Sequence, residues 1–515
     1  MMRKGVPQVF PFCIFTKMRK WIIILFLIGF HPFVWSQSLE LNQRCRTALE
    51  EILALRIEKG RMILKIEQDE NPSNKIPLLI ENYADFLKVF IDENRDDLFH
   101  LQSQKRDRIA AIEAVSEQNP LKNWALGSIY LQSAFARTKF EEHYAAALEI
   151  RKAFLLLESN QVEFPSFLPD RAGLGLIYAL IGSVPPQYQW VVKIASMKGS
   201  VQDGRAMLYS LLEALNDQSD YDFLHQEALF FLSFIEMNLN PDKEKAAQLL
   251  PMFRFFDQNN LLLTYAKANL EVRIGRNDAA LRTLAKRPSS DEYLKFHYLD
   301  YLQGEALLRK LDTIAQNFYS SFLKNYHGRN YRTDALRKIG WIALIKGDSL
   351  TYASVMKKVA SELPGQVETD HQAVREADAQ KFPHVDLLKA RLFFDGGYYV
   401  KAKVIMLKIE KQVENLNEDN LLEFYYRFGR IEHALGNTEK AKEYYHYTYS
   451  HGARSTLYFA ANAALMAGEI SELDGDTKQA TALYKLCLSM KPEEYRQGIH
   501  LKAKAGLNRL EKESE

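Results

Sequence analysis

Few side chains in this 515-residue chain have the types and spacing that binding or catalytic chemistry requires. Tyr444, His446 and His451 belong to an aromatic cluster that could suggest a metal or sugar site, but the two histidines are five residues apart, a poor spacing for one helical face. Asp474 and Asp476 could suggest a calcium loop, which needs acidic ligands at alternating positions and a later glutamate. A helix and a turn between helices explain both groups, so we predict no metal site.

No catalytic motif accompanies these residues. The chain has no His-Glu-x-x-His, no Cys-x-x-Cys, no phosphate-binding loop and no Gly-x-Ser-x-Gly elbow. Gly173 and Gly175 lack the third glycine and the preceding strand that a dinucleotide site requires. We therefore predict a protein without catalytic residues or cofactor. A glycan-active enzyme that uses one glutamate on a helical solenoid remains an open alternative, because paired carboxylates are too common here to single out.

The overall composition is that of a folded protein without a strong electrostatic preference. Hydrophobic residues make up 47% and charged residues 26%, and 67 basic residues oppose 65 acidic ones. Nucleic-acid binding usually calls for a clustered basic face, and the basic run at 105–108 contains an acid, so we expect no nucleic-acid partner. Three cysteines exclude a disulfide-rich scaffold, and the apolar surroundings of Cys487 favour a buried thiol over a disulfide with Cys45.

The first 36 residues have the pattern of a secretory signal peptide. A basic pair follows Met18, and an apolar run and small residues lead to Ser36, so cleavage would leave Gln37 as the mature N-terminus. Either Met1 or Met18 could be the start. The alternative is an uncleaved anchor, but the apolar stretch at 21–35 is shorter than the roughly 20 residues that a spanning helix needs. We predict export to the periplasm or association with the outer membrane.

The C-terminal part of the chain repeats itself at intervals of 39 residues. Four columns recur at that interval: Ala390, Gly429 and Gly468; Gly397, Gly436 and Gly475; Ala402, Ala441 and Ala480; Met406, Tyr445 and Tyr484. The first column lies in helical patterns, where a small residue lets a second helix approach closely. The second column is suited to a helix C-terminus, and the aromatic side chains lie one turn after the alanines. The columns predict successive pairs of antiparallel helices.

This order of small residue, turn glycine, small residue and aromatic residue resembles the tetratricopeptide repeat (TPR) family, whose usual period is about 34 residues. The resemblance is to an exported bacterial member, and it implies an all-α fold, a right-handed superhelical solenoid of antiparallel helix pairs. Weaker copies extend upstream through Gly340 and Gly304. We predict these boundaries: signal peptide 1–36; N-terminal helical region with atypical repeats and a Gly/Pro-interrupted apolar hairpin 37–219; TPR-like array 220–360; polar connecting segment, a loop or short solvated helix, 361–382; regular array 383–510.

The resemblance also implies where a partner binds. In that family, ligands lie along the concave surface lined by the first helix of each pair. Carried over to the three clear units, this surface contains His384, Leu387, Arg391, Phe394, Glu423, Tyr426, Arg430, His433, Asn462, Leu465, Glu469 and Glu472. Of these, the expected contacts with another cell-envelope protein are His384, Arg391, Phe394, Tyr426, Arg430, His433 and Glu469. Arginine and aromatic side chains dominate binding hot spots. The alternative is that they only solvate the inner surface.

Residues 171–206 interrupt the repeat pattern. A glycine-rich helix, a double proline and an apolar segment follow one another, an order similar to a eukaryotic TPR family associated with organelle outer membranes and lipid handling. A helical hairpin packed inside the array is one interpretation. An apolar lip within 183–199 that touches a membrane through Trp190, Val191 and Ile194 is another, and a buried small-molecule pocket is a third. We therefore expect a non-enzymatic exported scaffold, with lipid or membrane-surface association as an alternative.

Overall fold

The computed structural model describes residues 37–116, 118–184, 197–215, 221–239, 242–255 and 259–514. These residues form helices and turns and contain no strand, which confirms the all-α prediction; one isolated bridge joins Ser38 and Asn74. No helix in these ranges combines the length and the apolar character that crossing a bilayer requires. The predicted signal peptide, and the predicted membrane contacts Trp190, Val191 and Ile194, lie outside the described residues.

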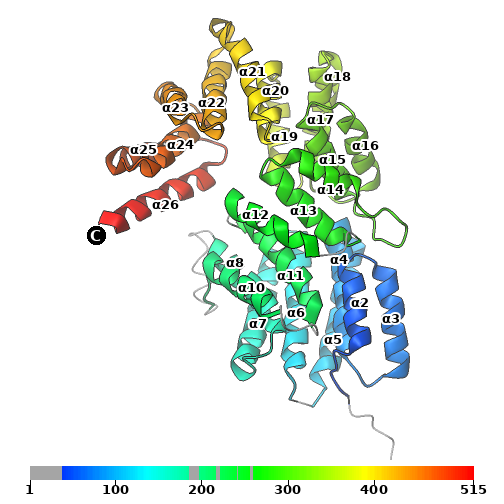
Figure 1. The fold of residues 1–515 in the computed structure, drawn as a ribbon. Helices are drawn as coiled ribbons and strands as arrows, with labels where there is room; N and C mark the ends of the chain where they lie inside the picture. The colour runs from blue at the N-terminus through cyan, green and yellow to red at the C-terminus, as the bar shows by residue number, and fades with distance from the viewer. Residues whose placement is uncertain are drawn as a thin grey trace, which may run out of the picture.

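Figure 1 shows the two halves of the described chain, with the N-terminal half below the C-terminal pairs. The N-terminal helices are α2 Gln43–Leu53, α3 Ile57–Glu70, α4 Ile76–Asp92, α5 Arg95–Glu113, α6 Pro120–Thr138, α7 His143–Glu163, α8 Pro169–Ser183, α10 Val201–Leu215, α11 Asp222–Phe234, the π-helix η3 Ile235–Leu239, α12 Lys243–Leu249 and the 3₁₀-helix η4 Leu250–Phe255.

The later helices are α13 Leu261–Arg273, α14 Asn277–Ala285, α15 Tyr298–Leu308, α16 Ala315–Asn325, α17 Arg332–Ile345, α18 Ser349–Ser361, α19 Glu368–Asp378, α20 Val385–Asp395, α21 Tyr399–Glu410, the 3₁₀-helix η5 Val413–Asn415, α22 Glu418–Ala434, α23 Thr438–His451, α24 Phe459–Leu473, α25 Thr477–Ser489 and α26 Arg496–Ser514. Consecutive helices pack as pairs, and each of the last pairs contacts the next.

The N-terminal helices pack mainly with their neighbours in sequence, as the pairs α2–α3, α6–α7 and α8–α10. One continuous apolar core runs between residues 39 and 306. The close approach of α6 and α7 depends on Gly127, where a Cβ atom would lie 2.7 Å from Leu157 Cγ. The glycine-rich helix α8 approaches α10 in the same way, through Gly175 and Gly204.

The residues that recur every 39 positions take equivalent places in successive pairs. Gly397, Gly436 and Gly475 follow the first helix of each pair with φ of +80°, +82° and +80°. Glycine adopts this left-handed conformation at no steric cost. Gly429 faces Tyr445, and a Cβ atom there would lie 2.7 Å from the tyrosine Cδ1. The alanines of the third column are fully buried. The reasons inferred for the repeated columns are therefore confirmed.

The segment 361–382 differs from the predicted solvated connection. It contains α19, which packs against α17 and α18. Asp370 is fully buried and accepts hydrogen bonds from the backbone N–H of Tyr331 (2.6 Å) and of Asp334 (2.9 Å) and from the hydroxyl of Thr333 (2.8 Å). This carboxylate caps α17 from another helix. The segment contains a short helix, as one of the two alternatives expected, but one side of that helix is buried and Asp370 caps α17 instead of facing solvent.

Figure 1 shows the C-terminal pairs as an arc, with α22 and α24 nearer the inside of the arc than α23 and α25. At the start of the arc, the turn at Gly397 touches the backbone of Gly275, in the turn between α13 and α14. Next to this contact, Asn277 Nδ2 donates to the Tyr398 hydroxyl (3.1 Å), which donates to Asp278 (2.8 Å). The arc is therefore attached to the α13–α14 pair through backbone and side-chain contacts.

Candidate functional site

The helices α17, α20 and α22, each the first of its pair, carry a row of side chains that we call the arginine–aromatic face. Its members are Arg337 and Trp341, which are buried, and Arg391, Phe394 and Arg430, which are partly exposed. The guanidinium carbons of Arg337 and Arg391 lie 4.7 Å and 5.2 Å from the Trp341 ring centroid. That of Arg430 lies 4.3 Å from the Phe394 ring centroid. Arg391 and Arg430 thus each stack on an aromatic ring of the preceding first helix. Such cation–π contacts hold a charged group in place without neutralising it.

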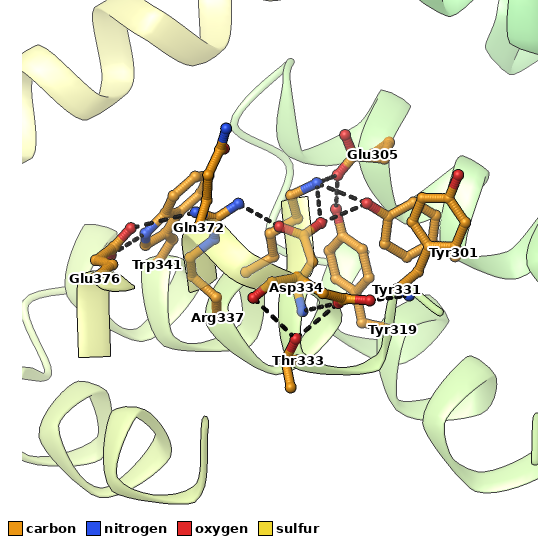
Figure 2. A network of polar contacts seen from close by, with 12 residues as sticks. Tyr301, Glu305, Tyr319, Tyr331, Thr333, Asp334, Arg337, Trp341, Gln372 and Glu376 are labelled. Carbon is orange, nitrogen blue, oxygen red and sulfur yellow. Dashed lines mark hydrogen bonds and ion pairs between the residues drawn. The ribbon is translucent and has the colours of Figure 1, made fainter. Parts of the chain in front are cut away.

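The Trp341 ring is held from behind by α19. Its indole Nε1 donates to Glu376 Oε1 at 2.8 Å, and the same oxygen accepts from the Tyr352 hydroxyl at 3.1 Å. Glu376 also pairs with Arg337 at 3.6 Å. Figure 2 shows Trp341, Arg337 and Glu376 at one end of a larger polar network. The ring on which Arg391 stacks is therefore held in place by the fold.

Beneath this end of the face lies a buried cluster of compensated charges (Figure 2). Lys338 pairs with Asp334 at 2.8 Å and with Glu305, and it donates to the Tyr301 hydroxyl at 3.0 Å. Arg337 pairs with the other oxygen of Asp334. Burial would raise the pKa of Asp334, but the charges of Lys338 and Arg337 hold it below its usual value. Arg337 is therefore committed to the fold and is not available to a partner.

Arg391 and Arg430 are in a different situation. Arg391 remains 31% exposed, and its ion pair is a long one, 3.8 Å from Nε to Asp395 Oδ2. Arg430 is half-buried and has neither an ion pair nor a hydrogen bond to another described residue. A guanidinium carries five N–H donors and no acceptor, so both side chains keep donors for an external acceptor.

Arg430 belongs to a group of charges around Lys243. Burial lowers the pKa of Lys243, at the start of α12, and the positive charges of Arg430, Arg309 and Lys502 lower it further. Asp395 is the neighbouring acid that opposes them. Helices far apart in sequence, α12, α22 and α26, therefore bring positive charge to one region. An excess of like charge in a confined region favours an anionic partner.

The two histidines predicted for this surface, His384 and His433, each contact a group of the fold. His384 caps α20, where its Nδ1 accepts from the Leu387 N–H at 3.4 Å. His433 lies beside Arg430, and its Nδ1 is 3.4 Å from the Tyr445 hydroxyl. Burial, and then the charge of Arg430, lower the pKa of His433. Because the neutral form is favoured, His433 adds no charge to the region at neutral pH.

Tyr426 and Glu469 also have defined places. Tyr426 is fully buried and its hydroxyl accepts from Asn462 Nδ2 at 2.6 Å. It therefore cannot touch a partner directly and instead supports Arg430, whose guanidinium carbon is 5.8 Å from the ring centroid. Burial raises the pKa of Glu469, although the charge of Lys502 opposes this. The remaining residues carried over from the family serve the fold: Leu387 and Leu465 are buried, and Glu423 and Glu472 pair with arginines.

One neighbour of the face comes from a segment without any repeat signal. Tyr495, in the loop between α25 and α26, accepts a hydrogen bond from Gln372 of α19 and packs on Tyr458 with ring centroids 4.9 Å apart. Arg375 of α19 pairs with Glu494 of the same loop at 3.2 Å. These contacts bring the C-terminal loop back to α19, beside the arginine–aromatic face. No periodic pattern in the sequence marks this loop.

Two features of the described residues bear on other chemistry. No group of three or more histidine, cysteine, aspartate or glutamate residues among them is arranged to hold a metal ion. Cys45 and Cys487 are buried free thiols, and burial raises the pKa of each to about 12, so neither is a reactive thiolate at neutral pH. In comparisons with known proteins, no protein-family model matches the chain and no curated protein matches it.

Proposed function

We propose that this chain is an exported, non-enzymatic scaffold of the TPR type, whose helix pairs form a right-handed superhelical solenoid. Its arginine–aromatic face binds an acidic segment of another protein of the cell envelope. The observation that carries the proposal is Arg430, which is stacked on Phe394, forms no ion pair with a described carboxylate and lies within electrostatic reach of Lys243. The repeated turn glycines and the basic, apolar leader support the architecture and the location.

An acidic partner would complete the interactions that the fold leaves open. Carboxylates can bind the free edges of Arg391 and Arg430 while aromatic or apolar side chains pack beside Phe394. Both arginines are presented by packed helices and not by loops, so little conformational entropy is lost on binding. Tyr426 contributes to this binding only indirectly, because its buried ring lies against Arg430.

A fluorescent glutamate-rich peptide tests the binding step directly. We expect the wild-type chain to bind it with an affinity that falls with salt, and the Arg391→Ala/Arg430→Ala variant to bind at least roughly tenfold more weakly. Arg454→Ala, which changes an exposed arginine in the loop after α23, is the matched control and should bind normally. Equal binding by the double variant, or equal binding of a peptide with glutamine in place of glutamate, would refute the proposed face.

Photo-crosslinking tests the partner class in the native host. A photoreactive residue in place of His433, beside Arg430, should capture an envelope protein whose crosslinked peptide is acidic. The same residue in place of Val404, which is 63% exposed on α21, serves as the control position. Capture of the same proteins at both positions, or crosslinks to nucleic acid, would contradict the proposal.

A further inference from the structure

The N-terminal half contains an apolar cavity between α4, α6, α8, α11 and α13. Its volume is about 90 Å³, within a larger depression of about 960 Å³ of empty space, solvent included. The walls are aromatic and aliphatic: Phe86, Trp124, Leu131, Leu176, Phe230 and Phe234. Such a lining offers apolar contacts to the hydrocarbon part of a ligand.

A small polar group interrupts this apolar wall. The Tyr83 hydroxyl donates to Glu227, and the side chains of Gln132 and Ser128 lie beside that hydroxyl. Glu227 is only 7% exposed, and no cation pairs with it in the described part of the chain. Burial raises the pKa of Glu227 to about 7, although the hydrogen bond from Tyr83 opposes this. The described residues that line the cavity include no lysine, arginine or histidine, so nothing in the lining would neutralise an anionic ligand.

Gln132 Nε2 makes no hydrogen bond with a described residue, although its side chain lies beside the Tyr83 hydroxyl. Arg108, which can only donate, gives a hydrogen bond to Asn82 Oδ1 at 3.0 Å. Asn82 must therefore turn its Nδ2 towards Gln132 Oε1, which accepts at 2.7 Å. This chain of bonds leaves Gln132 Nε2 as the free end, buried and without a partner among the described residues. Gln132 is 5% exposed, and a buried donor without an acceptor is costly unless water or a ligand supplies one.

We propose that this cavity binds a single-chain, uncharged amphiphile, such as a fatty alcohol or a monoacyl ester. The hydrocarbon chain lies against the aromatic wall, and the oxygen of the neutral head group accepts the hydrogen bond from Gln132 Nε2. The Tyr83 and Glu227 pair lies at the same polar end. This site is separate from the arginine–aromatic face, shares no residue with it, and does not depend on the proposed partner.

Trp124 lines the cavity and supplies a signal for the test. The full-length protein is titrated with ω-bromododecanol, whose bromine quenches tryptophan fluorescence on contact. We expect saturable quenching that is absent in Trp124→Phe. Bromododecane, which has no head-group oxygen, and ω-bromododecanoate at alkaline pH should each bind at least roughly tenfold more weakly than the alcohol, a loss of about 1.4 kcal/mol. Absence of saturable Trp124 quenching by the alcohol would overturn the cavity proposal.

Gln132→Leu isolates the role of the donor. This variant should bind the alcohol only as well as it binds bromododecane, because the hydrogen bond is lost while the apolar wall is kept. Unchanged preference for the alcohol would overturn the assignment of the head-group site. Circular dichroism checks that the variant folds. If it does not fold, the relative affinities of the wild-type chain for the alcohol, the alkane and the carboxylate decide the same question. Equal binding of the three ligands would refute a neutral, hydrogen-bonded head group.

Discussion

Replacing Gly429 with alanine tests whether close approach of two helices is what the repeated glycine provides. The added Cβ atom would lie 2.7 Å and 2.8 Å from Cδ1 and Cε1 of Tyr445, whereas carbon atoms in good contact are about 3.5–4.0 Å apart. The tyrosine ring would have to move by about 1 Å, but it is fully buried, and protein interiors are close-packed. Gly468 meets Tyr484 in the same way, at 2.8 Å and 2.9 Å.

The expected magnitude follows from two opposing effects. Alanine is favoured over glycine inside a helix by about 1 kcal/mol. Forcing an extra carbon into a packed core costs about 1–3 kcal/mol. The net result for Gly429→Ala and Gly468→Ala should therefore be a loss of up to about 2 kcal/mol in the free energy of unfolding, even though the same exchange at an open helical position stabilises.

Gly498 provides the matched control within the same chain. It lies exposed in α26, and nothing is within 4 Å of where its Cβ atom would be. Gly498→Ala should stabilise by about 0.5–1 kcal/mol, so the two classes of variant differ in sign. Urea unfolding followed by circular dichroism, with the slope checked for changes in cooperativity, measures both. Stabilisation by Gly429→Ala similar to that by Gly498→Ala would refute the close-packing argument.

Three further predictions concern buried titratable groups. The folded-state pKa of Glu227, about 7, lies above the ordinary value of about 4.3, so its contribution to stability is complete below about pH 4 and is lost as the pH rises towards 7. Glu227→Gln should therefore make the free energy of unfolding less dependent on pH over that range, as measured by urea titrations at several pH values. An unchanged pH profile would contradict the burial argument. Asp370→Ala should lower the free energy of unfolding by about 2–3 kcal/mol, because three hydrogen bonds are lost. It should also speed amide hydrogen exchange at the start of α17. Amide protection there equal to that of the wild type would exclude the capping role. Cys45 and Cys487 should resist iodoacetamide until the protein unfolds, and mass spectrometry showing rapid alkylation of the native protein would disprove their burial.

Local constraints explain what could be predicted from the sequence. The turn at Gly436 and the small residue at Gly429 each depend on neighbours within one helix pair, so their reasons can be inferred from spacing alone. The repeat also predicted the equal positions of Arg391 and Arg430 in successive units, although the rings that they contact belong to the preceding first helices. Periodicity did not reveal that Tyr426 would be buried, because its position within the helix faces Arg430 and the next pair at once.

Contacts between distant segments account for what could not be predicted. The cap that Asp370 supplies to α17 joins residues from two helices, and an acidic residue in a polar segment has no feature that marks it as buried. Tyr495 reaches α19 from a loop outside the repeat. The free amide of Gln132 follows only from the order of bonds through Asn82 and Arg108. Each depends on orientation in three dimensions, which hydrophobic patterns do not record.

The contact between the turns at Gly275 and Gly397 has a practical consequence for truncation. A fragment beginning at Val385 would match the regular repeats, yet it would lose Trp341 beneath Arg391 and the backbone that supports its first turn. We therefore expect the cooperative folding unit to extend on the N-terminal side of residue 383, where the regular repeats begin. Shorter versions of this protein should keep the chain intact from α13 onward if the last helix pairs are to retain their native arrangement.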